Sequence, residues 1–468
     1  MSEERKIRDP VHGFISVNEK ESEIIDTPIF QRLRRIRQLA FADLVYPGAT
    51  HTRFDHSLGV CHIAHSMARA LGLNEDQRRL VGVAALLHDL GHGPFSHVSE
   101  AALELYADHG KLRDRLKVQQ QIHELITADV MRTEPDLLKV LGSEGEKAAK
   151  LLLKGYGEPV CRQMVCGPLD ADKQDYLLRD SHFCGVKYGV FDIDQLQSEL
   201  CTVKESQRVG RQLAISGDGV HALEQFVLAK YYLTNQVYRH KVRLITDQML
   251  IRAVRLGIEV DQIEELAGIY AYDGSPEFAA KYTKWDDRLF LLRFGGEEFR
   301  GKYCFDLLRR LNERRLLKRV YKPKPLRELP ADCRDALSRI SDPRSKKGRD
   351  DLESALSVKI SENVGQHVDS RLVVVHAYTI KSLRQEGAGD EGGILVDESP
   401  RPPKTFEERS ALFRSISKGF SEGFVEVYAP VSYDTPCSRS ELLKKLEGPI
   451  TDVISTFLEA GGGKNGDA

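Results

Sequence analysis

Several hallmarks of common protein classes are missing from this sequence. None of its eight cysteines, at positions 61, 161, 166, 184, 201, 304, 334 and 437, forms a CxxC pair, so neither a zinc knuckle nor a disulfide framework is indicated. No apolar run approaches the length of a membrane span, and the opening MSEERKIRDP lacks the apolar stretch of a signal peptide. We therefore expect a cytoplasmic protein with reduced thiols and no membrane partner.

An excess of positive charge is also missing. The 468 residues include 68 lysines and arginines against 70 aspartates and glutamates, which gives a net charge of -2. Proteins that hold nucleic acid mainly through its phosphates usually carry a clear basic excess. The balance argues against that role, while leaving room for a local basic groove. The chain length and the 41% hydrophobic content suit a soluble protein with one large lobe and a smaller one.

Helical periodicity dominates residues 20–260. Apolar residues recur at helical spacing from Phe30 to Leu39, just after Pro28, which predicts a helix over 27–44. Three more helices are predicted: 56–72, which closes on a glycine; 74–93, which begins on a capping asparagine; and 217–250, as one helix or two. The segment RQLAIS before the last of these is consistent with a short hairpin strand.

The pattern changes after about residue 285. A charged amphipathic helix is predicted over 297–323, ended by prolines. Residues 370–380 and 423–431, rich in valine and tyrosine, predict strands, whereas 341–351 and 385–404 have the composition of loops. We expect a mainly α fold: a helical main lobe over 1–285, a smaller α/β lobe over 286–460 and a disordered tail over 461–468.

Histidines cluster early in the chain, with ten of the fifteen in the first 123 residues. In HDLGHGPFSH, at positions 88–97, His88 and Asp89 stand at the end of an apolar helix, where an isolated charged aspartate would be costly to bury. A divalent cation removes that cost, because neutral imidazole and carboxylate are natural ligands. Both residues reach one ion if it lies beyond the helix end, with further ligands from other helices. A helix C-cap is the alternative interpretation of the isolated pair.

These motifs resemble a known family. HDLGHGPFSH, with DPVHGFISV, IIDTPIFQRLRRIRQL, PGATHTRFDHSLGV, DADKQDYLLRDSHFCGV and VYRHKV in that order, is similar to the HD-domain deoxynucleoside-triphosphate (dNTP) triphosphohydrolases. Within that family the sequence most resembles the animal enzymes that carry SAM and HD domains and their bacterial relatives without the SAM module. The resemblance covers residues 5–250 firmly and the remainder loosely. It implies an HD-type helical lobe.

The resemblance implies a metal centre and a set of acid–base residues. The implied metal ligands are His56, His88, Asp89 and Asp172. The implied ion is iron, manganese, zinc or similar, with magnesium accompanying the triphosphate. The implied catalytic group is His92, His97, Glu100, His123 and Glu124. Within it His97 acts at the scissile bond as general acid, and Glu100, an aspartate in the relatives, orients it.

The resemblance also implies a nucleotide pocket. Residues implied around the phosphates and the sugar are Gln38, Leu39, Arg53, Lys173, Tyr176, Asp180, Lys230 and Tyr238. In the family a leucine and a tyrosine leave no room for a 2′-hydroxyl, although Leu39 and Tyr238 also fit an ordinary core. The chain departs from its relatives at Lys230 and Thr234, which replace an arginine and a histidine, and at Arg239, which replaces a glutamine. These changes affect substrate preference, since lysine cannot bind phosphate bidentately.

Regulation by a guanine nucleotide (GTP or dGTP) is a further implication. Residues that match an activator site are Asp26, Gln31, Arg34, Arg314 and Lys318. An amphipathic helix carrying ordinary surface charge explains the first three equally well. A second activator site is not expected, because Gln195, Gly217 and Gly219 occupy positions where basic residues would bind a dNTP. Sites of this kind lie between subunits, so a homo-oligomer, a dimer or a tetramer, is implied.

The sequence is compatible with three functions. The first is metal-dependent hydrolysis of dNTPs to deoxynucleoside and inorganic triphosphate. The second is hydrolysis of another phosphoester, by a nuclease, a nucleotidase or a hydrolase of signalling nucleotides. The third is a catalytically inactive scaffold that senses nucleotides or binds nucleic acid; the complete set of candidate metal ligands argues against it.

Overall fold

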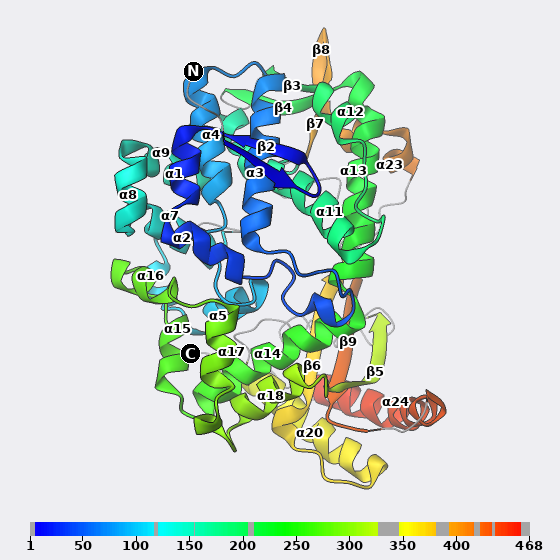
Figure 1. Cartoon of the computed structure of the whole chain (residues 1–468). Helices are drawn as coiled ribbons and strands as arrows, with labels where there is room; N and C mark the ends of the chain where they lie inside the picture. The colour runs from blue at the N-terminus through cyan, green and yellow to red at the C-terminus, as the bar shows by residue number, and fades with distance from the viewer. Residues whose placement is uncertain are drawn as a thin grey trace. The chain divides into compact units, whose positions relative to one another are not determined.

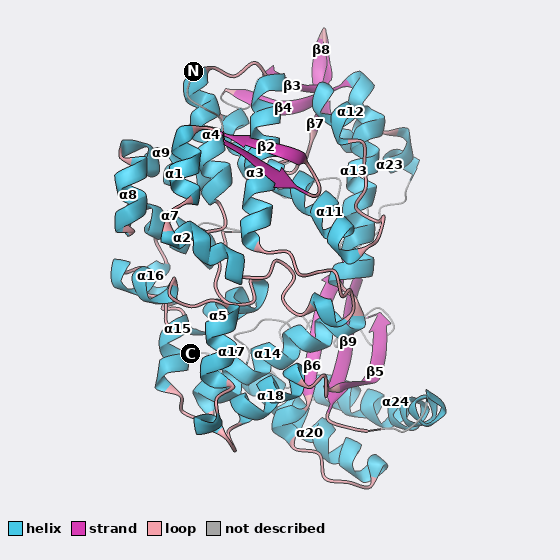
Figure 2. Cartoon of the chain, in the orientation of Figure 1, coloured by secondary structure: helices cyan, strands magenta, loops and turns pink. Residues whose placement is uncertain are grey.

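The computed structural model describes residues 5–116, 120–153, 155–204, 210–325, 346–380, 393–415, 422–432 and 436–459. Helices make up most of this part of the chain, and its strands lie in small sheets of two, three and four strands (Figures 1 and 2). No described helix is long and apolar enough to cross a membrane. The predicted fold class, mainly α with a smaller α/β region, is confirmed.

The chain divides into two compact units, each built from separate stretches of sequence. The first comprises Met1–His240, Ile269–Leu292 and Leu383–Gly419, and the second comprises Lys241–Gly268, Arg293–Ser382 and Phe420–Ala468. These ranges differ from the continuous lobes 1–285 and 286–460, which stay a prediction for independently folding domains. The predicted tail 461–468 lies outside the described residues.

The first unit is a helical assembly with a hairpin and a four-stranded sheet. Its earlier elements are β1 (Arg5–Asp9), β2 (Gly13–Val17), α1 (Glu19–Ile25), α2 (Pro28–Gln31), α3 (Arg53–Ala70), α4 (Glu75–Leu87), α5 (His97–Tyr106), α6 (His109–Leu112), α7 (Ile122–Thr133), α8 (Pro135–Leu141), α9 (Ser143–Leu152) and α10 (Pro159–Val165). Its later elements are α11 (Ala171–Cys184), α12 (Ile193–Ser198), β3 (Leu200–Lys204), β4 (Arg211–Ser216), α13 (Val220–Leu233), α16 (Pro276–Tyr282), β7 (Leu395–Glu398), β8 (Arg401–Thr405), α22 (Phe406–Arg409) and α23 (Ala411–Ser415).

Local capping explains where the two helices nearest the histidine motif begin and end. Asn74 caps α4 in a capping box with Gln77, and α4 ends at Leu87 with His88 in the C-cap position. The helix α3 begins after Thr52, whose capping box uses Asp55, and Gly72 follows its end with φ +61°. The helix predicted over 56–72 is confirmed, as is the strand RQLAIS, which is β4 and pairs antiparallel with β3. The helix predicted over 74–93 is confirmed only as far as Leu87, because the chain turns from His88 onward.

The predicted helix over 27–44 is wrong beyond its first two turns. The helix α2 stops at Gln31 and a 3₁₀ turn continues to Arg35. Ile36 is then extended, with φ −117° and ψ 113°, because its carbonyl accepts from Arg53 N (2.9 Å) at the start of α3. The apolar residues from Phe30 to Leu39 are buried, so their spacing reported burial rather than a continuous helix.

Two predictions outside the main helices also need correction. The loop predicted over 385–404 contains β7 and β8. The strand β7 pairs in parallel with β4 because Leu395 packs with Val203 and Ala214, and β8 tolerates its prolines as an edge strand. The predicted helix 297–323 ends at Asn312, because Val320 and Tyr321 beyond it are buried in a sheet.

The second unit packs helices on one face of a three-stranded sheet. Its elements are α14 (Lys241–Glu259), α18 (Tyr303–Asn312), β5 (Lys318–Pro325), α20 (Lys346–Val364), β6 (Val374–Ile380), β9 (Glu422–Ala429) and α24 (Pro436–Glu459). The chain passes between the units within α15 (Glu264–Tyr270) and α17 (Asp287–Phe294). The sheet has the order β5-β9-β6, which confirms strands over 370–380 and 423–431. Residues 346–351, predicted as a loop, begin α20.

The helix predicted over 217–250 is two helices in the structure. The first, α13, ends at Leu233, and a π-helical segment over Thr234–Tyr238 follows it. The second, α14, begins at Lys241 and belongs to the second unit.

Gly59 allows α3 to pack closely against α11. A Cβ at Gly59 would overlap Asp175 Oδ1 and Arg179 Nη2, two fully buried groups on α11 that form an ion pair. The two helices therefore meet over a position where only glycine leaves room for that pair.

Gly59→Ala is expected to lower the free energy of unfolding by about 3 kcal/mol, because the new methyl group must displace a buried ion pair. Gly268→Ala is the matched control: Gly268 lies in α15 with open space around it, and alanine there should stabilise by up to about 1 kcal/mol. Thermal unfolding followed by circular dichroism compares the two variants. Equal midpoints for both variants would contradict the assigned packing.

Candidate metal centre and active site

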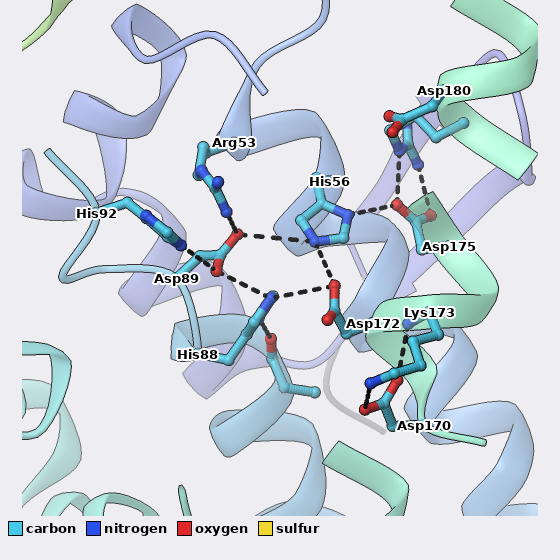
Figure 3. A network of polar contacts seen from close by, with 12 residues as sticks. Arg53, His56, His88, Asp89, His92, Asp170, Asp172, Lys173, Asp175 and Asp180 are labelled. Carbon is cyan, nitrogen blue, oxygen red and sulfur yellow. Dashed lines mark hydrogen bonds and ion pairs between the residues drawn. The ribbon is translucent and has the colours of Figure 1, made fainter. Parts of the chain in front are cut away.

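Four side chains predicted as metal ligands meet at one point (Figure 3). His56 comes from α3, His88 and Asp89 follow α4, and Asp172 lies in the first turn of α11. His56 Nε2 lies 3.0 Å from Asp172 Oδ1 and 3.7 Å from Asp89 Oδ2. His88 Nε2 lies 3.3 Å from Asp89 Oδ1 and 3.9 Å from Asp172 Oδ1. The structure therefore brings together residues that are up to 116 positions apart.

The donor set fits a divalent cation. His56 Nδ1 donates to Asp175 Oδ2 (2.8 Å) and His88 Nδ1 donates to the Ala85 carbonyl (2.7 Å), which leaves both Nε2 atoms facing the carboxylates. Both Nε2 atoms are buried without a hydrogen-bond partner. Two imidazole nitrogens and two carboxylates that converge in this way are ligands for a transition metal ion.

Charge at this point also favours a cation. Burial lowers the pKa of His56, but Asp172 and Asp175 outweigh it and raise this pKa to about 10. Burial alone would raise the pKa of Asp89, yet Arg53, His88 and His92 hold it well below its usual range. The site is therefore built around a positive charge.

Asp175, which the sequence reasoning missed, orients the first ligand. Its carboxylate accepts from His56 Nδ1, from His12 Nε2 (2.6 Å) and from Arg179 Nε (2.8 Å) and Nη2 (3.0 Å). Arg179 Nη1 also donates to Asp9 (2.8 Å) at the end of β1. A carboxylate that holds the second nitrogen of a ligating histidine fixes its tautomer and ring orientation. The spacing of three residues from Asp172 on α11 was the available signal.

The predicted acid–base residues lie beside this centre. Ligand atoms of Asp89, His92 and His123 lie within 4.8 Å of one another, and the rings of His92 and His123 stack with centroids 3.8 Å apart. Burial, with Arg53 and His123 close by, holds the pKa of His92 well below its usual range, so this imidazole is neutral. His97 is exposed at the first position of α5, its ring 6.0 Å from that of His92.

Glu100, which was predicted to orient His97, forms its hydrogen bonds with His123 and the backbone beside it. Its carboxylate accepts from His123 Nδ1 (2.9 Å) and from the backbone N–H groups of Ile122 (2.6 Å) and His123 (3.1 Å). Burial lowers the pKa of His123, but Glu100 outweighs it and raises this pKa. The orientation of His97 by Glu100 stays a prediction. Glu124 is half-buried beside His123 on α7.

The loop between His92 and His97 has a strained backbone. Phe95 and Ser96 have φ values of +60° and +54°, a region that side chains other than glycine rarely adopt. Asp287 accepts from Phe95 N (2.7 Å), and Ser96 Oγ donates to the Arg37 carbonyl (2.8 Å) while accepting from Arg53 Nε (2.8 Å). These contacts hold the conformation that places His97 at the start of α5.

Two more buried residues support the same loop, and sequence reasoning missed one of them, Arg32. Arg32 donates to the carbonyls of Leu90 (3.3 Å) and His92 (2.8 Å). Gly91 packs so closely on α7 that a Cβ would overlap the backbone at His123 and Thr127. Glycine at position 91 is therefore needed for the close packing of the loop on α7.

The residues predicted for the sugar form a connected group. Asp180 accepts from Tyr238 Oη (2.5 Å) and from His51 Nε2 (2.8 Å), and the Tyr176 ring lies 6.1 Å from that of Tyr238. Gln38 N donates to the carbonyl of His51 (3.1 Å), and the buried Gln38 Oε1 has no hydrogen-bond partner. Leu39 is buried.

The residues predicted to bind the phosphates differ in how far their donor groups are already paired within the chain. Arg53 Nη1 pairs with Asp89, whereas its buried Nη2 has no partner. Lys173 pairs with Asp170 (2.8 Å) at the start of α11. Lys230 is half-buried on α13, while Thr234 and Arg239 begin and follow the π-helical segment.

The predicted activator residues belong to both units: Asp26, Gln31 and Arg34 to the first, and Arg314 and Lys318 to the second. Asp26 is exposed and accepts from Arg5 (2.9 Å), while Gln31 accepts from Arg34 Nε (2.8 Å), whose guanidinium lies 3.5 Å from the centre of the Phe54 ring. Arg314 and Lys318 belong to the second unit, where burial and the neighbouring Arg314 and Arg439 lower the pKa of Lys318.

Asp175→Asn should weaken metal binding by about 10- to 100-fold, because the amide cannot accept the full set of hydrogen bonds that holds His56. Asp129→Asn is the control, since Asp129 is a carboxylate on α7 that binds Arg115 and Tyr272 away from these ligands. Titration with manganese followed by electron paramagnetic resonance measures both affinities. Unchanged affinity in Asp175→Asn would remove its assigned role.

Comparisons with known proteins agree with this geometry. The HD domain family matches residues 53–172, and the HD associated region matches residues 200–336. The chain is 33% identical over 340 residues to the uncharacterized protein YwfO of Bacillus subtilis, covering 68% of this chain and 72% of YwfO. It is 29% identical over 379 residues to the deoxynucleoside triphosphate triphosphohydrolase SAMHD1 of Gallus gallus, covering 74% of this chain and 61% of that protein.

Solved structures show the same fold. A hypothetical protein from Aquifex aeolicus superposes with a TM-score of 0.67 at 25% identity, covering 95% of this chain and all of that one. A phosphohydrolase from Bacteroides thetaiotaomicron superposes with a TM-score of 0.68 at 24% identity, covering 91% of this chain. With the HD motif, its associated region and a relative matched over most of its length, the chain belongs to the HD-domain phosphohydrolase family.

Proposed function

We propose that this protein hydrolyses dNTPs to deoxynucleoside and inorganic triphosphate. The observation that carries the proposal is the arrangement along α11, where Asp172, Tyr176 and Asp180 recur every four residues. Such residues lie on one helix face, about 6 Å apart along the axis. Asp172 is at the metal centre and Asp180 is at the tyrosine group, so one helix face spans from a phosphate site to a sugar site. The similarity to SAMHD1 supports the same substrate class.

The candidate ligands His56, His88, Asp89 and Asp172 would hold a divalent iron, manganese, zinc or similar ion. Such an ion supplies Lewis acidity at a phosphate oxygen and lowers the pKa of the attacking water. Asp89 also lies within reach of His92 and His123, of which His92 is the neutral imidazole. Arg53 Nη2 and Lys173 offer positive donors to the non-bridging oxygens. Magnesium accompanies the triphosphate in this proposal.

Hydrolysis at the α-phosphorus requires a proton for the departing 5′-oxygen. His97 suits this role because it is exposed beside the buried histidine pair and rigidly placed by the strained loop. Water attacks phosphorus, the bond to O5′ breaks, and the leaving oxygen takes the proton from His97. Asp180 and Tyr238 hold the sugar, and Leu39 with Tyr238 leaves no space for a 2′-hydroxyl.

Regulation and assembly complete the proposal. A guanine nucleotide would bind Asp26, Gln31 and Arg34, with Arg314 and Lys318 on its phosphates, in a homo-oligomer of two or four chains in the cytoplasm. The second candidate function is hydrolysis of another phosphoester, which is favoured by Lys230 and Thr234 at positions where the SAMHD1-like family carries arginine and histidine.

The wild-type protein with Mn²⁺ should release triphosphate and deoxynucleoside from dNTPs, and act much more slowly on ATP than on dATP. Asp89→Ala should lose both metal and turnover, because the ion is held by that carboxylate. Chromatography of products from dNTPs, ATP and a short oligonucleotide, with and without GTP, makes the comparison. Release of diphosphate or monophosphate, or cleavage of the oligonucleotide, would favour the second candidate. Faster turnover with GTP would support the activator site.

His97→Ala should keep its metal yet lower kcat by about 10²- to 10⁴-fold, because the leaving oxygen loses its proton donor. Metal content by mass spectrometry and single-turnover rates test both halves of this statement. His109→Ala, an exposed histidine at the start of α6, is the control and should match the wild type. Full activity in His97→Ala would transfer the role of general acid to another residue.

A further inference from the structure

A second group of metal-ligand types lies on α1 and α3, and no proposed step uses its residues. Cys61 and His65 are one turn apart on α3, and Glu21 faces them from α1. One ligand atom from each residue lies within 4.8 Å of the other two. His65 Nε2 donates to Glu21 Oε1 (2.6 Å). The group therefore joins two helices through three different donor types.

The chemistry of this trio matches a borderline-soft divalent ion. Thiolate, imidazole and carboxylate are all ligands that Zn²⁺ accepts, and one Zn²⁺ balances one thiolate and one carboxylate. The Glu21 carboxylate is 1% exposed and accepts from Asn18 N (3.0 Å) as well as from His65, whereas a thiolate at Cys61, which is 0% exposed, would be costly there without a cation. The His65 side chain is 24% exposed, which leaves a path by which an ion can enter.

A third helix keeps the space open. Gly82 on α4 faces the trio, and a Cβ at this position would lie 2.6 Å from His65 Cε1 and 2.8 Å from both His65 Nε2 and Glu21 Oε1. A side chain would therefore enter the volume where the ligand atoms meet. Glycine here is an observation independent of the ligand types, and it points to the same spot.

We propose that Glu21, Cys61 and His65 bind one Zn²⁺ with a water molecule as the fourth ligand, in a structural site that fastens α1 to α3. On binding, the thiol proton passes to solvent and the His65 proton moves from Nε2 to Nδ1, so both ligand atoms become available while the imidazole stays neutral. Burial and the Glu21 carboxylate raise the pKa of the Cys61 thiol, so the metal-free site holds the thiol protonated. Because α3 also carries His56, the site would stiffen the helix that presents a ligand of the HD centre.

Cobalt substitution tests this site without any measurement of turnover. Co²⁺ bound to a thiolate absorbs in the near ultraviolet through charge transfer, and the HD centre, with histidine and aspartate ligands, has no thiolate to produce that band. The reduced full-length protein is titrated with Co²⁺, and both the band and the bound cobalt per chain are recorded. Asp89→Ala should keep the band, since the HD ligands do not contribute to it.

Cys61→Ser should lose the band and one equivalent of cobalt, whereas Cys184→Ser, a buried cysteine on α11 outside the trio, should keep both. His65→Asn and Gly82→Ala provide second routes to the same loss if Cys61→Ser does not fold. A wild-type titration without the band would overturn the proposal, as would a band that survives in Cys61→Ser. The proposed dNTP hydrolysis is unaffected by either result.

Discussion

The buried carboxylate of Asp175 is the contact on which the metal centre depends. It accepts hydrogen bonds from a histidine on α3, from a histidine in the turn after β1 and from an arginine on its own helix. A buried carboxylate is stable only when its charge is met in this way. By meeting it with His56 and Arg179, the fold ties the N-terminal hairpin, α3 and α11 together. The same bonds aim His56 Nε2 at the other ligands.

Close packing at two glycines brings the other elements of the candidate site together. Gly59 lets α3 approach α11, and Gly91 lets the histidine loop approach α7. Asp287 holds Phe95 in an unfavourable conformation, and burial raises its own pKa to about 6. Strain of this kind persists only where surrounding contacts fix it. The active-site loop is thus positioned by residues that never touch a substrate in the proposed reaction.

Sequence patterns predicted the ligands and much of the helical framework, but not the groups that aim them. His56, His88, Asp89 and Asp172 stand in motifs that carry their chemistry in their spacing. Asp175 offers only its three-residue spacing from Asp172, and Asp287 has no such signal, because the role of each depends on partners far away in the chain. The helix predicted over 27–44 failed because apolar spacing reports burial, and the backbone at Ile36 had a better partner at Arg53. The trio of Glu21, Cys61 and His65 was invisible because its carboxylate comes from another helix.

The π-helical turn at Thr234–Tyr238 sets the direction of Tyr238, a residue proposed to contact the sugar. A wide turn of this type contains one residue more than a regular α-helical turn would, and such turns recur at functional positions. Removing any single residue from it would let regular geometry return and swing the phenol of Tyr238 by about 100° away from Asp180. The aim of this side chain is therefore set by segment length as much as by residue identity. An insertion or deletion here would redirect Tyr238 without substituting any residue proposed to contact the sugar.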